Sequence, residues 1–249
     1  AQQGPLRRGL GSEFPDGSVQ AGLRRRQLPV VRRRHPHRRT QWTGLLHHHL
    51  EPGQRGLGKV GGVVNLITGT SSGNRSALTS GLNQKAEDGS LVFTAVVMNL
   101  TAITTRATFI GLTDTVSLEN PIEISGTTLT TNATDAVGFV YDTDATTDVV
   151  YIQGVAADVD TPLLTAQRQN RGGATFVPTA GTYDEYRIEV NVDGDAYFYI
   201  NGEYVGTQPN AVTPTVLLTP IVLVETRTTS AATVYVDYLS NEAGRDQQP

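Results

Sequence analysis

From Gly62 onward the chain alternates between short runs of β-branched and aromatic residues and clusters of Gly, Asn, Asp and Pro. Runs of about four to eight such residues between turn-forming residues are typical of β-strands, whereas a helix would show apolar positions with a period of about 3.6. The predicted strands lie within residues 62–69, 89–100, 106–114, 136–143, 148–156, 161–168, 184–192, 195–201, 203–209, 215–228 and 232–240. Short strands at this spacing, without a convincing helix, predict an all-β sandwich or barrel.

The clearest pattern lies between residues 184 and 209, where two adjacent hairpins are predicted. Asn201-Gly202 is a preferred dipeptide of the type I′ turn, which joins two antiparallel strands through a short loop. This turn predicts three cross-strand pairs: Ile200 with Glu203, Tyr199 with Tyr204, and Phe198 with Val205.

The preceding turn allows two registers, which differ in the side chains that share a face. A loop of residues 193–194 would place Ile188 and Val190 on the face of Tyr197 and Tyr199. A loop of residues 193–195 instead gathers the aliphatic positions on one face, and we prefer it because register decides which face is buried. The gathered residues are Ile188, Val190, Val192, Ala196, Phe198 and Ile200. The opposite face then carries Arg187, Glu189, Tyr197, Tyr199 and Tyr204, an aromatic and charged surface suited to contact with another molecule.

Charge divides the chain in two. Residues 1–59 contain twelve Lys and Arg against three acidic residues, and residues 60–249 contain eight against twenty-one. High charge with few apolar residues predicts that residues 1–58 form an extended or disordered basic arm. The sandwich domain is expected at residues 59–240 and a polar tail at 241–249. No apolar run approaches the roughly 18 residues that span a bilayer, so no membrane partner is expected.

Eight arginines are clustered in the arm: Arg24, Arg25, Arg26, Arg32, Arg33, Arg34, Arg38 and Arg39. They suit contact with an acidic surface of a neighbouring subunit, and nucleic-acid phosphate is the less favoured partner. A further reading is that residues 1–58 are disordered or are not natural coding sequence, because Arg triplets, His runs and scattered Gly and Pro are what a GC-rich gene gives in the wrong frame.

The run EYRIEVNVDGDAYFYINGEYVGTQPNAV, residues 185–212, resembles the two-hairpin signature of concanavalin-like, laminin-G-like jelly rolls. The wider run from GGVVNLITG to GTYDEYRIEVN resembles a family of tailed-bacteriophage virion proteins, over about residues 60 to 240. The resemblance implies a concanavalin-like jelly-roll β-sandwich of two antiparallel sheets with an irregular N-terminal arm. It also implies a virion component, such as a capsid decoration (cement) protein or a head fibre, and no reaction.

Motifs that suggest catalysis lack their required context. GQRGLGKV, residues 53–60, has Val60 where a P-loop needs Ser or Thr. GTSSG, residues 69–73, resembles a nucleophile elbow around Ser71, but no His follows it in the chain. Glycanases on concanavalin-like folds carry an E-x-D-x-x-E motif, which is absent. Glu185 and Glu189 share a strand face with Arg187 between them, which predicts an ion pair rather than a general acid.

No metal or cofactor is expected. Aspartates in two turns could offer oxygen ligands to calcium, but Asp is ordinary in turns, and neither stretch completes a calcium loop. These aspartates are Asp142, Asp144, Asp148, Asp193 and Asp195. The histidines lie in the arm, where nothing fixes a tetrahedral zinc geometry; they are His35, His37, His47, His48 and His49. Cysteine is absent, which excludes disulfides and thiolate ligands.

We therefore predict a non-enzymatic structural protein of a virion, assembled in the host cytoplasm. Its expected partners are the major capsid protein or other virion proteins, together with further copies of itself. The alternative is a carbohydrate-binding adhesion module of a virion, with Tyr197 and Tyr199 stacking on a host or environmental glycan. A third reading is a glycan lyase or hydrolase on the same fold.

Overall fold

The computed structural model describes residues 47–50, 62–99 and 103–244, with residues 47–50 described as strand backbone alone. The chain divides by contacts into Ala1–Trp42 and Thr43–Pro249, and all the described residues belong to the second unit. The basic-arm arginines, the 53–60 motif and most of the polar tail lie outside the described residues.

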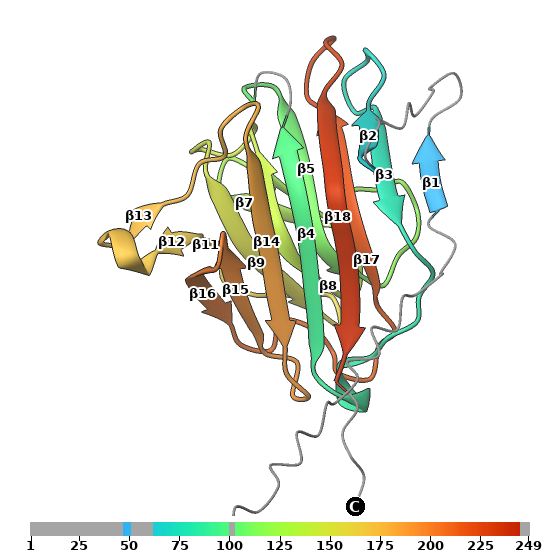
Figure 1. The fold of residues 1–249 in the computed structure, drawn as a ribbon, viewed down its shortest axis with the longest axis vertical. Coiled ribbons are helices and arrows are strands. Elements are labelled where there is room, and N and C mark those ends of the chain that lie inside the picture. Colours follow the sequence, from blue (N-terminus) through green and yellow to red (C-terminus); the bar gives the residue numbers. More distant parts are fainter. Residues whose placement is uncertain (1–46, 51–61, 100–102, 245–249) are drawn as a thin grey trace, which may run out of the picture. The chain divides into compact units, whose positions relative to one another are not determined.

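Two large antiparallel sheets form the body of this unit (Figure 1). The six-stranded sheet has the order β16 (Glu203–Gln208), β15 (Ala196–Ile200), β14 (Tyr183–Val190), β4 (Leu91–Asn99), β18 (Thr233–Ala243) and β2 (Val64–Ile67). The eight-stranded sheet has the order β1 (His47–Leu50), β3 (Arg75–Thr79), β17 (Thr219–Thr226), β5 (Arg106–Thr113), β8 (Ala136–Asp142), β9 (Val150–Ala156) and β10 (Val159–Asp160), with β11 (Leu164–Thr165) also paired to β9. The predicted all-β sandwich of two antiparallel sheets is confirmed.

Small elements complete the described fold. Two further hairpins consist of β6 (Ile122–Ser125) with β7 (Thr128–Thr131), and of β12 (Gln167–Arg168) with β13 (Ala174–Thr175). The only helical elements among the described residues are two single 3₁₀ turns, η1 (Ala86–Asp88) and η2 (Gln169–Arg171). No helix in these ranges is long and apolar enough to cross a membrane.

The main core lies between the two sheets. Phe139 of β8 is its aromatic centre, with ring centroids 5.1 Å from Tyr186 and 5.2 Å from Phe198, both in edge-to-face geometry. Alternate residues of β14 and β15 point into this core, and Ile188, Phe198 and their inward neighbours are fully buried. Period-two alternation in the sequence therefore places one face of these strands inside and leaves the other outside.

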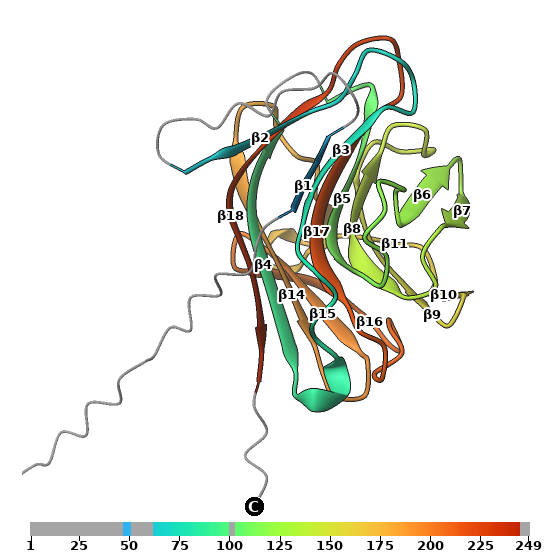
Figure 2. The ribbon, with the colours of Figure 1, turned by 90° about the vertical axis from the view of Figure 1, so that its right-hand side faces the viewer.

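A second core covers the outer face of the eight-stranded sheet. The β6–β7 hairpin lies on the side that faces away from the six-stranded sheet (Figure 2). It buries Ile122 and Ile124 completely, in one cluster with Phe109 of β5. Every residue of β5, β8 and β17 is consequently buried on both faces. By contrast, β4 alternates between buried and half-exposed residues, so the open face of the sandwich belongs to the six-stranded sheet.

The predicted register of the two hairpins needs two corrections. Tyr199 pairs with Tyr204 as predicted, but Phe198 pairs with Gly206, because a β-bulge adds Val205 to one strand. Val190, and not Val192, pairs with Ala196, so Val192 lies in the loop and is 40% exposed.

The longer loop is explained by Asn191. Its side-chain Oδ1 accepts hydrogen bonds from the backbone N–H groups of Asp193 and Asp195, and its own N–H donates to the Asp195 carbonyl at 2.9 Å. An Asn side chain that accepts a hydrogen bond from the backbone N–H two residues later closes a turn, and cross-strand pairing stops before this residue. Because the register shifts by two residues, the side chains within the strands stay on their predicted faces, and Val192 alone leaves the buried set.

Six of the described strands were not predicted: β1, β3, β6, β7 and the two-residue strands β10 and β13. Strand β1 pairs His47 with Thr79, within the stretch expected to be an irregular arm. Strand β3 follows a Gly/Ser turn and is short. The β6–β7 hairpin is mostly polar. The sequence feature that indicates it is the two-residue loop of Gly126 and Thr127, in which Gly126 has a φ of +62° that suits a tight hairpin turn. Strand β18 also continues to Ala243, beyond the predicted domain end.

Candidate functional site

The five surface residues predicted from the sequence lie together on the outer face of the six-stranded sheet. The register defines one row across five strands and a second row beside it. The first row is Tyr204, Tyr199, Arg187, Thr94 and Ser240. The second is Thr207, Tyr197, Glu189, Val92 and Glu242. We call the part of these rows formed by Arg187, Glu189, Tyr197, Tyr199 and Tyr204 the tyrosine face.

Contacts within the tyrosine face hold its side chains in place. The rings of Tyr199 and Tyr204 meet edge to face, with centroids 5.7 Å apart and an interplanar angle of 66°. The guanidinium carbon of Arg187 lies 5.3 Å from the Tyr199 ring centroid, in cation–π range. Arg187 also forms an ion pair with Glu189. Four of the five side chains (Arg187, Glu189, Tyr199 and Tyr204) are thus positioned before any ligand arrives, which lowers the entropic cost of binding.

The hydroxyl groups of Tyr199 and Tyr204 have hydrogen-bond partners on the same face of the sheet, whereas the rings of Tyr197 and Tyr204 remain partly exposed. Tyr199 donates a 3.4 Å hydrogen bond to Glu189 Oε2, and the Tyr204 hydroxyl lies 2.6 Å from Thr207 Oγ1. Partial burial, with the nearby Glu189 carboxylate, raises the pKa of Tyr199, so its hydroxyl stays protonated at neutral pH. Tyr197 and Tyr204 remain 37% and 39% exposed, so both rings can stack on a ligand.

Two further exposed tyrosines on the same sheet face escaped the sequence reading. Tyr183 alternates with the buried Asp184 on β14 and is 41% exposed. Tyr238 is 49% exposed and pairs with Val96 of β4. Strict alternation along β18 would place Tyr238 on the inner face with Val236, but a bulge between the two reverses its direction.

Asn201 anchors the turn that carries Tyr199 and Tyr204. Its φ of +53° is the left-handed value that a type I′ turn needs. Its side-chain Nδ2 donates to Asp184 Oδ1, and its Oδ1 accepts from the Glu185 backbone N–H, both at 2.8 Å. Asn201 therefore fixes the β15–β16 hairpin to β14 as well as forming the turn.

Two buried carboxyl groups and one half-buried carboxyl group predict how the stability of the fold changes with acid. Burial raises the pKa of Asp114, Asp184 and Glu225, against partly opposing hydrogen bonds and charges. A carboxyl group whose pKa is raised by folding stabilises the folded state while the group is protonated. This contribution is full at pH values below the pKa of the group in the unfolded chain, and it is lost as pH rises through the pKa in the folded state. We expect the free energy of unfolding to increase as pH falls from about 7 toward about 4, the ordinary pKa of carboxyl groups in the unfolded chain. Urea unfolding at both pH values measures it, and Asp184→Asn should reduce the gain; a fall in stability over this window contradicts the account.

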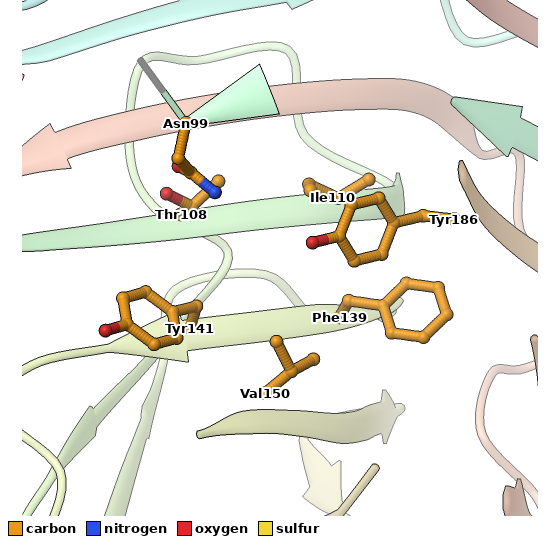
Figure 3. Close-up of a pocket in the computed structure, with 7 residues that line it drawn as sticks. All are labelled: Asn99, Thr108, Ile110, Phe139, Tyr141, Val150 and Tyr186. Atoms are coloured by element: carbon orange, nitrogen blue, oxygen red, sulfur yellow. The ribbon is translucent and has the colours of Figure 1, made fainter. Parts of the chain in front are cut away.

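Two cavities lie away from the tyrosine face. One of about 10 Å³ lies between the sheets and is bordered by Asn99, Thr108, Tyr141 and Tyr186 among its seven lining residues (Figure 3). It is about the size of one water molecule. Burial lowers the pKa of the neighbouring Arg106 to about 10 and raises that of Tyr141 to about 12, so Arg106 stays charged and Tyr141 stays neutral near neutral pH.

The larger cavity is an open groove of about 290 Å³ beside the edge strand β16. It is lined by Ile152, Leu163, Leu164, Thr165, Gln167, Gln169, Val205 and Gly206. None of these side chains titrates near neutral pH, so the groove offers no general acid or base.

Asp142 acts both as a turn residue, as predicted, and as a buried ion-pair partner. The Asp142 Oδ1 accepts a hydrogen bond from the Asp144 backbone N–H at 3.1 Å. The Asp142 side chain is fully buried and pairs with Arg227, which also pairs with Glu225 at 2.7 Å. Glu123 of β6 and Arg75 of β3 join the same cluster at 3.1 to 3.3 Å. The cluster ties the β6–β7 hairpin to the eight-stranded sheet, and sequence reading did not find it.

The other candidate groups have local structural roles. Ser71 lies in the β2–β3 turn, where its backbone carbonyl accepts from the Asn74 N–H at 3.0 Å. Asp195 Oδ1 accepts from the Asn210 N–H at 2.9 Å. Within residues 62–99 and 103–244, no group of three or more His, Asp or Glu residues is arranged to hold a metal ion.

No family model and no curated protein matches the chain. Among solved structures, the alginate lyase AlyC3 in complex with dimannuronate is similar with a TM-score of 0.52 at 8% identity, over 75% of this chain and 76% of that one. The likeness shows the fold alone, a jelly-roll β-sandwich. Cellulose induced protein Cip1 has a TM-score of 0.48 at 13% identity, over 83% of this chain and 88% of that one. The carbohydrate binding module CBM66 from Bacillus subtilis has a TM-score of 0.43 at 11% identity, over 76% and 91%.

Proposed function

We propose that the protein is a non-catalytic recognition module that binds glycan chains on the tyrosine face. The observation that carries the proposal is the pair of exposed rings, Tyr197 and Tyr204. They lie beside the Arg187–Glu189 ion pair on a sheet face that no described element covers. A pyranose ring has an apolar face of C–H groups and a rim of hydroxyls. A tyrosine offers a matching apolar ring and polar end, while the carboxylate of Glu189 accepts hydroxyl hydrogen bonds.

The absence of a reactive arrangement on this face favours binding over catalysis. A glycosidase needs two carboxyl groups flanking one bond, one of them kept protonated. Here Glu189 is held by Arg187 and by the Tyr199 hydroxyl, and Glu185 lies exposed on the same strand. The two acids are thus placed as hydrogen-bond acceptors.

Alanine variants of the exposed tyrosines test the proposal. We expect Tyr197→Ala and Tyr204→Ala to weaken binding of a short oligosaccharide, selected on a glycan array, by about tenfold or more, because a well-placed aromatic contact carries at least about 1.4 kcal/mol. Isothermal titration calorimetry measures the affinity.

The matched control is Tyr238→Ala. Tyr238 lies on the same sheet face with similar exposure, four strands from Tyr204 in the sheet order, or about 19 Å at the usual strand spacing. It should leave the affinity of a short oligosaccharide unchanged. An affinity that survives both Tyr197→Ala and Tyr204→Ala overturns the proposal.

A second candidate is subunit contact within a virion, with the protein acting as a capsid decoration protein or head-fibre component. It is supported by the half-exposed Val92 and Val96 and the exposed Tyr238, which extend an aromatic and apolar surface across the sheet. Tyrosine-rich surfaces of this kind suit protein interfaces. The same tyrosine variants separate the candidates: weaker incorporation into particles with unchanged glycan affinity supports the virion role, and the reverse supports glycan binding.

A further inference from the structure

The charges around the tyrosine face define the class of glycan that it accepts, if the proposed function holds. Besides the exposed bulge residue Asp237, four charged side chains point outward from β14 and β18: Glu185, Arg187, Glu189 and Glu242. They comprise three acids and one base, so the face carries a net negative charge. The surrounding sequence is also acidic, with twenty-one acidic against eight basic residues from position 60 onward.

Arg187 is not free to bind a carboxylate on a ligand. Its guanidinium is paired with Glu189 and lies over the Tyr199 ring. Recognition of a uronate or sulfate group relies on Arg or Lys side chains whose donors point at the anion. On the described strands of the six-stranded sheet, Arg187 is the only basic residue, so an anionic sugar would meet no unpaired cation on this sheet.

The remaining polar groups suit uncharged hydroxyls. Glu185 and Glu189 accept hydrogen bonds, and hydrogen bonds from a hydroxyl to a carboxylate are among the stronger neutral-to-ion contacts. Thr94 and Ser240 continue the row and can both donate and accept. We infer that the tyrosine face selects neutral hexopyranose or pentopyranose chains and rejects polyuronates and sulfated glycans.

Retention on polymer-coupled polyacrylamide beads tests this inference with the full-length protein. The neutral probes are hydroxyethyl cellulose, glucomannan and dextran, and the anionic probes are alginate and polygalacturonate, with uncoupled beads as the blank. We expect retention on at least one neutral polymer, lost with Tyr197→Ala. Because surface repulsion is screened by salt, we expect no retention on either anionic polymer at low salt.

Two variants make the charge argument specific. Glu189→Gln releases Arg187 from its ion pair, and the double variant Glu185→Gln, Glu189→Gln also removes a second carboxylate. Both should give measurable retention on alginate, where none is expected of the wild-type protein, whereas Glu87→Gln, at an exposed ion pair in η1, should not.

The outcomes separate this inference from the proposed function. Wild-type retention that is stronger on alginate or polygalacturonate than on every neutral polymer, and is lost with Tyr197→Ala, overturns the inference but leaves glycan binding in place. Retention on no polymer at all overturns both.

Discussion

Replacing Arg227 with methionine is expected to lower the free energy of unfolding by about 3–5 kcal/mol. The substitution removes the cation that pairs with Asp142 and Glu225, whose side chains are only 0% and 2% exposed. Two carboxylates would be left in the protein interior with too little positive charge near them, and an unpaired buried charge is far more costly than an unpaired charge in water.

Urea denaturation of the purified variant measures this loss. Lys85→Met is the matched control, because the Lys85–Glu87 pair is about one-third exposed at Lys85 and 41% at Glu87. Exposed pairs contribute between about 0 and 1 kcal/mol. If Arg227→Met changed stability by no more than Lys85→Met does, the buried cluster would have no role in holding the β6–β7 hairpin.

Phe198→Ala is expected to cost a similar amount, about 3–5 kcal/mol, because it opens a cavity in the main core. The side chain is fully buried, and its ring lies against Phe139. Tyr197 is the next residue on the same strand but points outward. Tyr197→Ala should therefore change stability by less than about 0.5 kcal/mol, while weakening the binding of glycan.

Thermal and urea unfolding of both variants provides the comparison. The comparison of Phe198→Ala with Tyr197→Ala tests whether the inward side chains of β15 stabilise the fold while its outward side chains bind the ligand. Equal losses of stability in the two variants would show that the tyrosine face belongs to the structural core, and would contradict its role as a binding surface.

Alternation explains why so much of the tyrosine face could be predicted from the sequence. The hairpin turn at Asn201-Gly202 fixes local pairing, and period-two patterning then decides which side chains point outward. The two register errors changed pairing partners and moved Val192 into the loop, but they did not exchange the faces of the strand residues. The placement of Arg187, Tyr197 and Tyr204 on one surface therefore followed from residues close together in the chain.

The buried ion cluster could not be predicted in the same way. Arg75 and Glu225 are 150 residues apart in the chain, and Arg227 and Glu123 are 104 apart. Nothing local indicates that these residues meet, because their contact depends on the order of β3, β17, β8 and β6 in space. Asp142 looked like an ordinary turn residue for the same reason.

Bulges were a second source of error. One residue inserted into β18 reverses the direction of Tyr238, and one inserted into β16 brings Gly206 opposite Phe198. An added Cβ at Gly206 would lie 2.4 Å from Ile152 Cδ1, so this glycine permits close packing against β9. The need for glycine at this position comes from a side chain of the opposite sheet, so the sequence of β16 alone does not indicate it.

The most direct test of the account is an NMR titration of the protein with a neutral oligosaccharide, following the tyrosine ring signals together with the Ile, Leu and Val methyl signals. The account predicts saturable shifts at Tyr197, Tyr199 and Tyr204, with Tyr183 and Tyr238 unaffected by a short ligand. Shifts confined to the groove beside Ile152, Leu164 and Val205, with the tyrosine rings unchanged, would contradict it.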